Sequence, residues 1–171
     1  MSKKKPGEKS GQKLTGYEPC CPQFDPRRWD EKELLWKDKL FIRGDVFCIL
    51  HAPLTMGRVI TRLWHQALTV KAEPELDEFL ILSYEASPWK SEQYMAVTRE
   101  VPHIANVKLS GTFLTKVFEG SYRLSRRWHR QMYDYVKDQG RTPKRIFFYY
   151  TTCPRCAKYY KKNYVVVVAE V

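Results

Sequence analysis

The sequence predicts an α+β fold made of two similar strand–helix–strand–strand modules with antiparallel sheets. Three observations predict it: an internal repeat, apolar strands that flank both copies of the repeat at the same spacing, and a length of 171 residues. That length suits one domain, or two small modules that share a core. One module alone would leave a sheet face and a helix stripe uncovered, so two copies packed together are the economical arrangement.

The repeat consists of residues 58–68 and 122–132, which align at an offset of 64. Three positions are identical in the two segments: Arg62/Arg126, Trp64/Trp128 and His65/His129. Apolar residues spaced at i, i+4 and i+8 predict that both segments are helices with one buried stripe. The stripes are Ile60, Trp64 and Leu68 in the first helix, and Leu124, Trp128 and Met132 in the second. We expect the first helix to start at Pro53 and the second to stop at Gly140.

The other elements follow from composition and alternation. The expected segments are a disordered basic leader at 1–16, an arm at 17–40, and a domain at 41–171 whose modules run over about 41–102 and 107–171. The expected strands are 45–52, 79–85 and 93–97 in the first half, and 109–118, 144–150 and 164–171 in the second. Prolines exclude a long regular element in the arm, where 30–36 is expected to form a helical turn. In the strand at 144–150, alternation directs Ile146 and Phe148 toward the helices and leaves Phe147 and Tyr149 on the open face.

Charge and cysteine content argue against several classes of protein, namely nucleic-acid-binding, membrane and secreted proteins. The net charge is +11, but the basic residues fall into separate groups, which is more typical of solvated faces than of a nucleic-acid-binding stripe. Nucleic acid is therefore not an expected partner. No apolar run approaches the roughly 20 residues that span a bilayer, so no membrane association is expected. The odd number of cysteines, 5, gives no secreted disulfide framework, and we expect a cytoplasmic protein.

The second half also carries a family resemblance. Residues 109–122, the helix with Trp128 and the aromatic strand at 146–150 resemble the second half of GyrI-like (gyrase-inhibitor-like) small-molecule-binding proteins. Gly120-Ser121-Tyr122 stands where that family shows a Gly-Pro-Tyr-like turn. The resemblance covers about 41–171 and implies an SHS2-type pair of modules in a free-standing, single-domain member.

The resemblance also implies a function. It implies a cleft between the modules that takes flat, aromatic, often cationic molecules, as in multidrug binding or sequestration. The alternative is a hydrolase that acts on cyclopropane-containing or related toxic molecules. DNA gyrase is a partner by this resemblance only. Whether the chain is an enzyme stays open at this stage.

Physical chemistry suggests the residues of such a cleft. An aromatic cation needs aromatic faces and a poorly solvated carboxylate. The candidates are Glu85, Trp89, Tyr94, Glu119, Tyr122, Phe147 and Tyr149. Glu119 precedes a helix N-terminus, which favours negative charge, and in a hydrolase it is the residue expected to act with water. For each residue alone, a place in the core or in a helix turn is an equally good interpretation.

The cysteines leave two further interpretations open. Cys153-Pro-Arg-Cys156 follows a strand, as in a glutaredoxin active site, and nearby basic residues favour a thiolate, although the chain after Cys156 is too short for that fold. With Cys20 and Cys21, the same pair supplies four soft ligands for zinc. Because adjacent cysteines are expected to chelate poorly, we expect no metal and no other cofactor, with zinc as the alternative.

Overall fold

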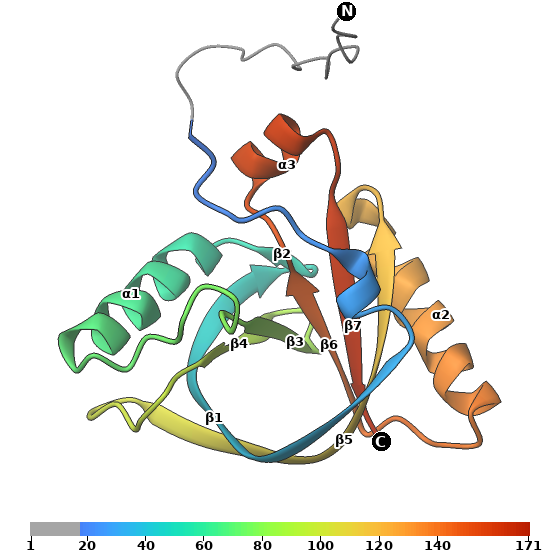
Figure 1. Cartoon of the computed structure of the whole chain (residues 1–171), viewed down its shortest axis with the longest axis horizontal. Coiled ribbons are helices and arrows are strands. Elements are labelled where there is room, and N and C mark those ends of the chain that lie inside the picture. Colours follow the sequence, from blue (N-terminus) through green and yellow to red (C-terminus); the bar gives the residue numbers. More distant parts are fainter. Residues whose placement is uncertain (1–17) are drawn as a thin grey trace, which may run out of the picture.

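The computed structural model describes residues 18–171 and is shown in Figure 1. The leader expected at 1–16 lies outside the described residues. The strands are β1 (Lys32–Ile49), β2 (Ala52–Pro53), β3 (Ile81–Ser87), β4 (Lys90–Ala96), β5 (Ala105–Glu119), β6 (Arg145–Tyr150) and β7 (Tyr164–Glu170). The helices are α1 (Met56–Thr69), α2 (Ser125–Asp138) and α3 (Pro154–Tyr160), with short 3-10 turns η1 (Pro26–Arg28) and η2 (Tyr122–Leu124). Within the described residues, no helix is long and apolar enough to cross a membrane.

The strands form one antiparallel sheet whose two ends meet. The order is β2-β1-β4-β3-β6-β7-β5, and β1 also pairs with β5, so that six strands close into a barrel. Strand β1 can do both because it is 18 residues long: 32–43 pairs with β5, and 41–47 pairs with β4. A register shift between Trp36 and Lys39 interrupts the β1–β5 pairing. Closure leaves none of these six strands as a free sheet edge.

The predicted α+β class and element order are confirmed. The first half runs β1–α1–β3–β4 and the second runs β5–α2–β6–β7. Two features differ from the expectation. The strands of both halves join in one closed sheet, and α3 lies between β6 and β7, where no helix was expected.

Helices α1 and α2 cover opposite flanks of the barrel (Figure 1). Their buried residues are Val59, Leu63 and Ala67 on α1, and Trp128, Met132 and Val136 on α2. The stripe expected on α2 is therefore largely right, whereas the stripe expected on α1 is displaced: Leu68 is exposed and Trp64 only half-buried. Helix α1 has a second apolar stripe, Val59, Leu63 and Ala67, beside the expected one. This second stripe faces the sheet, and its small Ala67 side chain lets the helix approach the sheet closely. The sequence alignment at an offset of 64 residues pairs Trp64 with Trp128. In the structure, the buried residue at the same position of α1 as Trp128 in α2 is Val59.

The barrel interior is filled by side chains from all six strands. Its buried members are Phe41, Leu80, Leu82, Tyr94, Ala96, Leu109, Phe113, Phe147, Val166 and Val168. On β6, Ile146 and Phe148 pack under α2, while Phe147 and Tyr149 face the interior, so the alternation predicted for this strand is confirmed.

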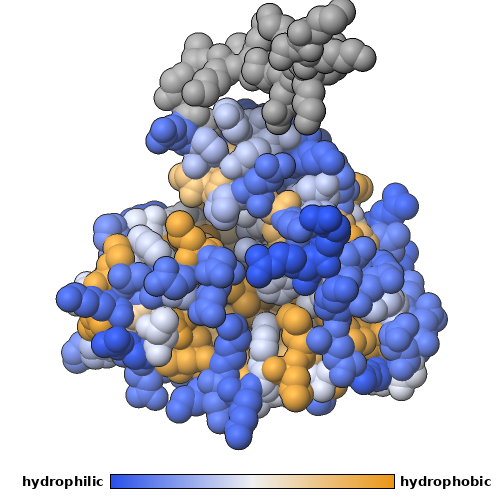
Figure 2. Space-filling view, viewed as in Figure 1, coloured by the Kyte–Doolittle hydropathy of each residue, from blue (hydrophilic) through white to orange (hydrophobic). Residues whose placement is uncertain are grey.

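The arm differs from its prediction. The helical turn expected at 30–36 is wrong, because β1 already begins at Lys32. Leu34 and Trp36 alternate toward the interior and pack against its core, which a strand satisfies and a helical turn does not. The preceding residues cross one end of the barrel and reach α3 (Figure 1). In this view, hydrophobic residues reach the surface in separate groups among hydrophilic ones (Figure 2).

Candidate functional site

Aromatic rings from the arm and from two strands meet at one end of the barrel. Phe24 lies with its ring centre 5.8 Å from that of Tyr164 and 6.4 Å from that of Tyr149. Trp29 lies 5.5 Å from Tyr149. We call Phe24, Trp29, Tyr149 and Tyr164 the aromatic cage. The arm therefore covers this end of the barrel by placing its own rings against two strand tyrosines.

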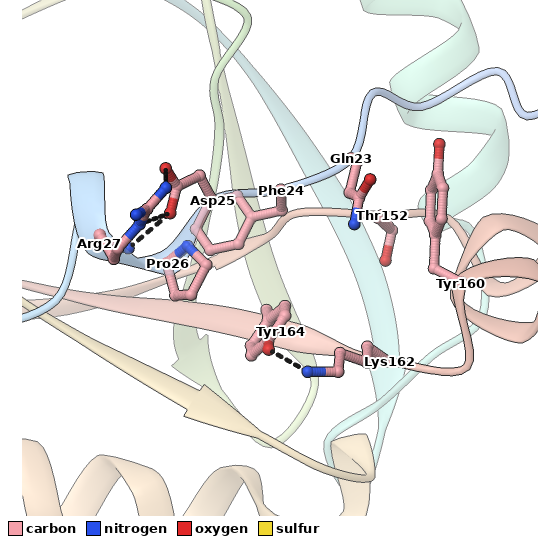
Figure 3. A pocket seen from close by; sticks show the side chains of 9 residues that line it. All are labelled: Gln23, Phe24, Asp25, Pro26, Arg27, Thr152, Tyr160, Lys162 and Tyr164. Carbon is pink, nitrogen blue, oxygen red and sulfur yellow. Dashed lines mark hydrogen bonds and ion pairs between the residues drawn. The ribbon is translucent and has the colours of Figure 1, made fainter. Parts of the chain in front are cut away.

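A pocket of about 510 Å³ opens beside the aromatic cage (Figure 3). It is lined by Gln23, Phe24, Asp25, Pro26, Arg27, Thr152, Tyr160, Lys162 and Tyr164. Asp25 is paired with Arg27 at 2.9 Å, and Lys162 donates a hydrogen bond to the hydroxyl of Tyr164 at 3.2 Å. This volume is within the range of pockets for drug-sized molecules.

One polar atom in the pocket wall lacks a partner. The hydroxyl oxygen of Thr152 is buried, and no hydrogen bond to it occurs among the described residues. Buried hydroxyl groups are normally hydrogen-bonded. Because this oxygen is buried, a molecule in the pocket can reach it only after the Thr152 side chain moves.

Charged residues gather at the other end of β6. Arg145, at the start of the strand, donates a hydrogen bond to Glu170 at 2.6 Å, and the Tyr94 hydroxyl donates one to Glu92 at 2.6 Å. The Glu92 side chain is only 13% exposed and also pairs with Lys90 at 3.2 Å. Burial, and then the bond to Glu92, raise the pKa of Tyr94 to about 12. Tyr94 is therefore a neutral donor that orients a shielded carboxylate.

Sequence reasoning missed Glu92 and Glu170, although alternation could have found both. Glu92 lies two positions before Tyr94 on β4, and Glu170 lies two positions after Val168 on β7. Residues two apart on a strand share a face. Both glutamates therefore belong to the inward-facing sets of their strands.

The seven predicted ligand-binding residues do not form one group. Tyr94, Phe147 and Tyr149 belong to the barrel interior. Glu85 lies on the outer face, since its neighbour Tyr84 points inward, and it hydrogen-bonds His51 at 2.6 Å.

The remaining three predicted residues lie elsewhere. Trp89 is 55% exposed beside the β3–β4 turn, and Glu119 is exposed at the end of β5. Tyr122 stacks edge-on with Tyr150 and donates a hydrogen bond to the carbonyl of Thr152. None of the three lines the pocket of about 510 Å³ beside the aromatic cage.

A second pocket, which we call the outer groove, includes Glu85. It has a volume of about 400 Å³ and lies between β3, β6 and α2. Its lining residues are His51, Glu85, Ser125, Arg126, His129, Arg130, Tyr133 and Phe148. The groove is rich in basic side chains, and its one carboxylate is already bonded to His51.

Four cysteines meet where the arm passes α3. The sulfurs of Cys20, Cys21, Cys153 and Cys156 all lie within 4.8 Å of one another. Burial raises the pKa of Cys21 to about 12, against the lowering effect of the amide of Cys153. Hydrogen bonding with Cys156 and Cys153 raises the pKa of Cys20. Although adjacent Cys20 and Cys21 are expected to chelate poorly, both of their sulfurs lie within 4.8 Å of those of Cys153 and Cys156.

Several solved structures share the fold. An uncharacterized conserved protein from Listeria innocua aligns with a TM-score of 0.58 and 12% identity, over 82% of this chain and 91% of that one. A hydrolase encoded by lin2189 from Listeria innocua gives 0.57 and 10% over the same shares. SAV2435 bound to tetraphenylphosphonium gives 0.49 and 12%, over 83% of this chain and 93% of that one, a likeness too low to extend that ligand to this chain.

The family comparison is more specific. No curated protein matches the sequence. The family described as "Bacterial hydrolase" matches residues 12–171, which is nearly the whole chain. The match does not name GyrI-like proteins, so that resemblance stays a prediction. The chain belongs to the bacterial hydrolase family.

Proposed function

We propose that the protein binds small, flat, aromatic molecules in the pocket between the arm and β7. The observation that carries the proposal is the position of Phe24, whose ring lies against Tyr149 and Tyr164 beside the pocket. Aromatic pairs at such distances are favourable beyond the area they bury. A ligand ring in the pocket can add a further aromatic contact with Phe24 or Tyr164, which both line it.

The charges of the pocket favour neutral or anionic ligands. Arg27 and Lys162 line it together with one carboxylate, Asp25, which Arg27 already neutralises. The counter-charges expected for a cation, Glu85 and Glu119, do not line this pocket. A net charge of +11 adds long-range attraction for anions, although salt screens it beyond about 8 Å. The preference for cations that the GyrI-like resemblance implies therefore has no support at this pocket.

A titration with fluorescent flat dyes of negative, zero and positive charge tests this proposal. Tyr164→Ala removes one wall of the pocket and is expected to weaken dye binding roughly 3- to 10-fold, the equivalent of one aromatic contact. The matched control is Tyr133→Ala, a tyrosine of the outer groove, which should leave dye affinity unchanged. The opposite pattern, with only Tyr133→Ala weakening the binding, contradicts the proposal.

Hydrolysis is a second candidate function, favoured by the family and by one carboxylate. Glu92 is shielded, held by the Tyr94 hydroxyl and paired with Lys90, so its oxygens are fixed in place at the charged end of the barrel. A fixed carboxylate can take a proton from an attacking water molecule. Glu119, the residue expected from sequence for this role, is exposed and lacks comparable partners among the described residues.

Mass spectrometry of ligands incubated with the protein tests the hydrolytic role. We expect the product to gain one water molecule, Glu92→Gln to lower the rate at least about 100-fold, and dye binding at the arm-covered pocket to persist. Glu85→Gln on the outer face is the matched control and should keep the full rate. Equal rates in the Glu92→Gln variant and the unmodified protein contradict this role.

A further inference from the structure

The four-cysteine cluster joins two segments that lie far apart in the chain. Cys20 and Cys21 belong to the arm, whereas Cys153 and Cys156 lie at the start of α3. No other described group of His, Cys, Asp or Glu offers three or more potential ligand atoms in such proximity. None of the four cysteines lines the pocket of about 510 Å³ beside the aromatic cage.

The sulfur positions fit a tetrahedral metal ion. The sulfur of Cys20 lies 3.9 Å from that of Cys21, 3.8 Å from Cys153 and 3.7 Å from Cys156. Four sulfurs at a zinc–sulfur distance of about 2.3 Å in a tetrahedron are about 3.8 Å apart. Three near-equal separations of this size are the spacing that one shared central ion requires.

The surroundings supply what such an ion needs. Cys156 is fully buried, and the backbone amide of Cys153 donates a hydrogen bond to the sulfur of Cys21 at 3.4 Å. The Tyr160 hydroxyl donates to the carbonyl of Cys21 at 2.7 Å and so holds the arm against α3. Four thiolates around a divalent ion leave two negative charges, and the nearby chain carries the basic residues Arg155, Lys158 and Lys161.

We propose that Cys20, Cys21, Cys153 and Cys156 form a structural zinc site that fastens the arm to α3. All four coordination positions are protein thiolates, as in structural rather than catalytic zinc sites. Cys-x-x-Cys at 153–156 supplies half of the ligands at the spacing typical of zinc knuckles. Because Phe24 and Trp29 follow Cys21 by three and eight residues in the arm, the zinc site holds the aromatic cage over the end of the barrel.

The geometry does not favour a dithiol redox site. A disulfide joins two sulfurs at about 2.05 Å and leaves the remaining pair without a role. Here Cys20 is nearly equidistant from its three neighbours, so a redox pair of Cys153 and Cys156 gives no reason for its position. Tetrahedral four-sulfur sites hold zinc or iron, and the experiment separates the two metals.

Metal analysis of the full chain, purified with zinc and without chelator, tests this site. We expect about one zinc per chain, and its loss in Cys20→Ser and in Cys156→Ser. The matched control, Cys48→Ala, changes a cysteine buried under α1 and should keep the zinc. Replacement of zinc by Co²⁺ should give the sulfur-to-cobalt charge-transfer absorption of a four-thiolate site. This measurement uses the unmodified protein, so it tests the site even if a serine variant does not fold.

Fastening of the arm has its own readout. Arg27 and Arg28 are exposed trypsin sites in the arm. We expect chelation of zinc to speed cleavage there at least about tenfold, since the arm then opens more often. A protein without zinc, one that holds iron instead, or one whose zinc survives Cys20→Ser and Cys156→Ser overturns the zinc site. Zinc whose removal leaves the cleavage rate unchanged overturns the fastening role.

Discussion

Gly44 on β1 sets how closely α1 approaches the barrel. A Cβ atom at this position would lie 2.6 Å from Cγ1 of Val59 and 3.3 Å from both Cδ atoms of Leu63. Neither neighbour can move far, because Leu63 is fully buried and Val59 nearly so. The absent side chain at Gly44 is therefore what seats the buried stripe of α1 against the sheet.

Gly44→Ala should destabilise the fold. Overpacking of this kind costs typically about 1–3 kcal/mol, measured as the free energy of unfolding in urea. Gly57→Ala is the matched control, because a Cβ atom there meets nothing within 4 Å, and a helical alanine is favoured over glycine. Equal stability of Gly44→Ala and the unmodified protein contradicts this view of the contact between α1 and β1.

Individual site residues were only partly predictable. Alternation on β6 correctly placed Ile146 and Phe148 toward the helix and Phe147 and Tyr149 on the opposite face, although that face is the barrel interior and not an open surface. The same rule, applied to β3, would have excluded Glu85, which follows inward-facing Tyr84. Phe24 could not be found, since no periodic pattern in a proline-rich arm indicates which ring reaches the barrel.

Among the elements, those with strong local patterns were predictable. Helix α2 and strands β6 and β7 lie within a few residues of their expected ranges. Strand β1 begins far earlier than expected because its first part is stabilised by pairing with β5, more than 70 residues away in sequence. Helix α3 was not predictable because it has only 7 residues. The residues at its start contact Cys20 and Cys21, which lie more than 130 residues earlier in the sequence.

The arm is fixed to the barrel by specific polar contacts as well as by the aromatic cage. The buried hydroxyl of Thr115 on β5 donates a hydrogen bond to the carbonyl of Trp29. The carboxylate of Asp30 accepts one from the amide of Val117 at 2.9 Å. The arm and β5 are therefore joined by hydrogen bonds to a backbone carbonyl of the arm and from a backbone amide of β5.

For the whole molecule, closure of the sheet changes where a ligand can bind. The resemblance to GyrI-like proteins implied a cleft between two modules, but Phe41, Phe113 and Phe147 are fully buried within the closed barrel. Pairing of β1 with β5 was not predictable from alternation, which fixes the face of each strand and not its partner. Two pockets of the described residues lie outside this closed interior, at the arm-covered end and in the outer groove.

Hydrogen exchange with and without a saturating dye tests most directly the claim that ligands bind at the arm-covered end. We expect the dye to slow amide exchange at 23–27 and at 162–164, because these segments line the pocket between the arm and β7. Exchange at 126–133, which borders the outer groove, should stay the same. Protection of 126–133 without protection of 23–27 contradicts the account.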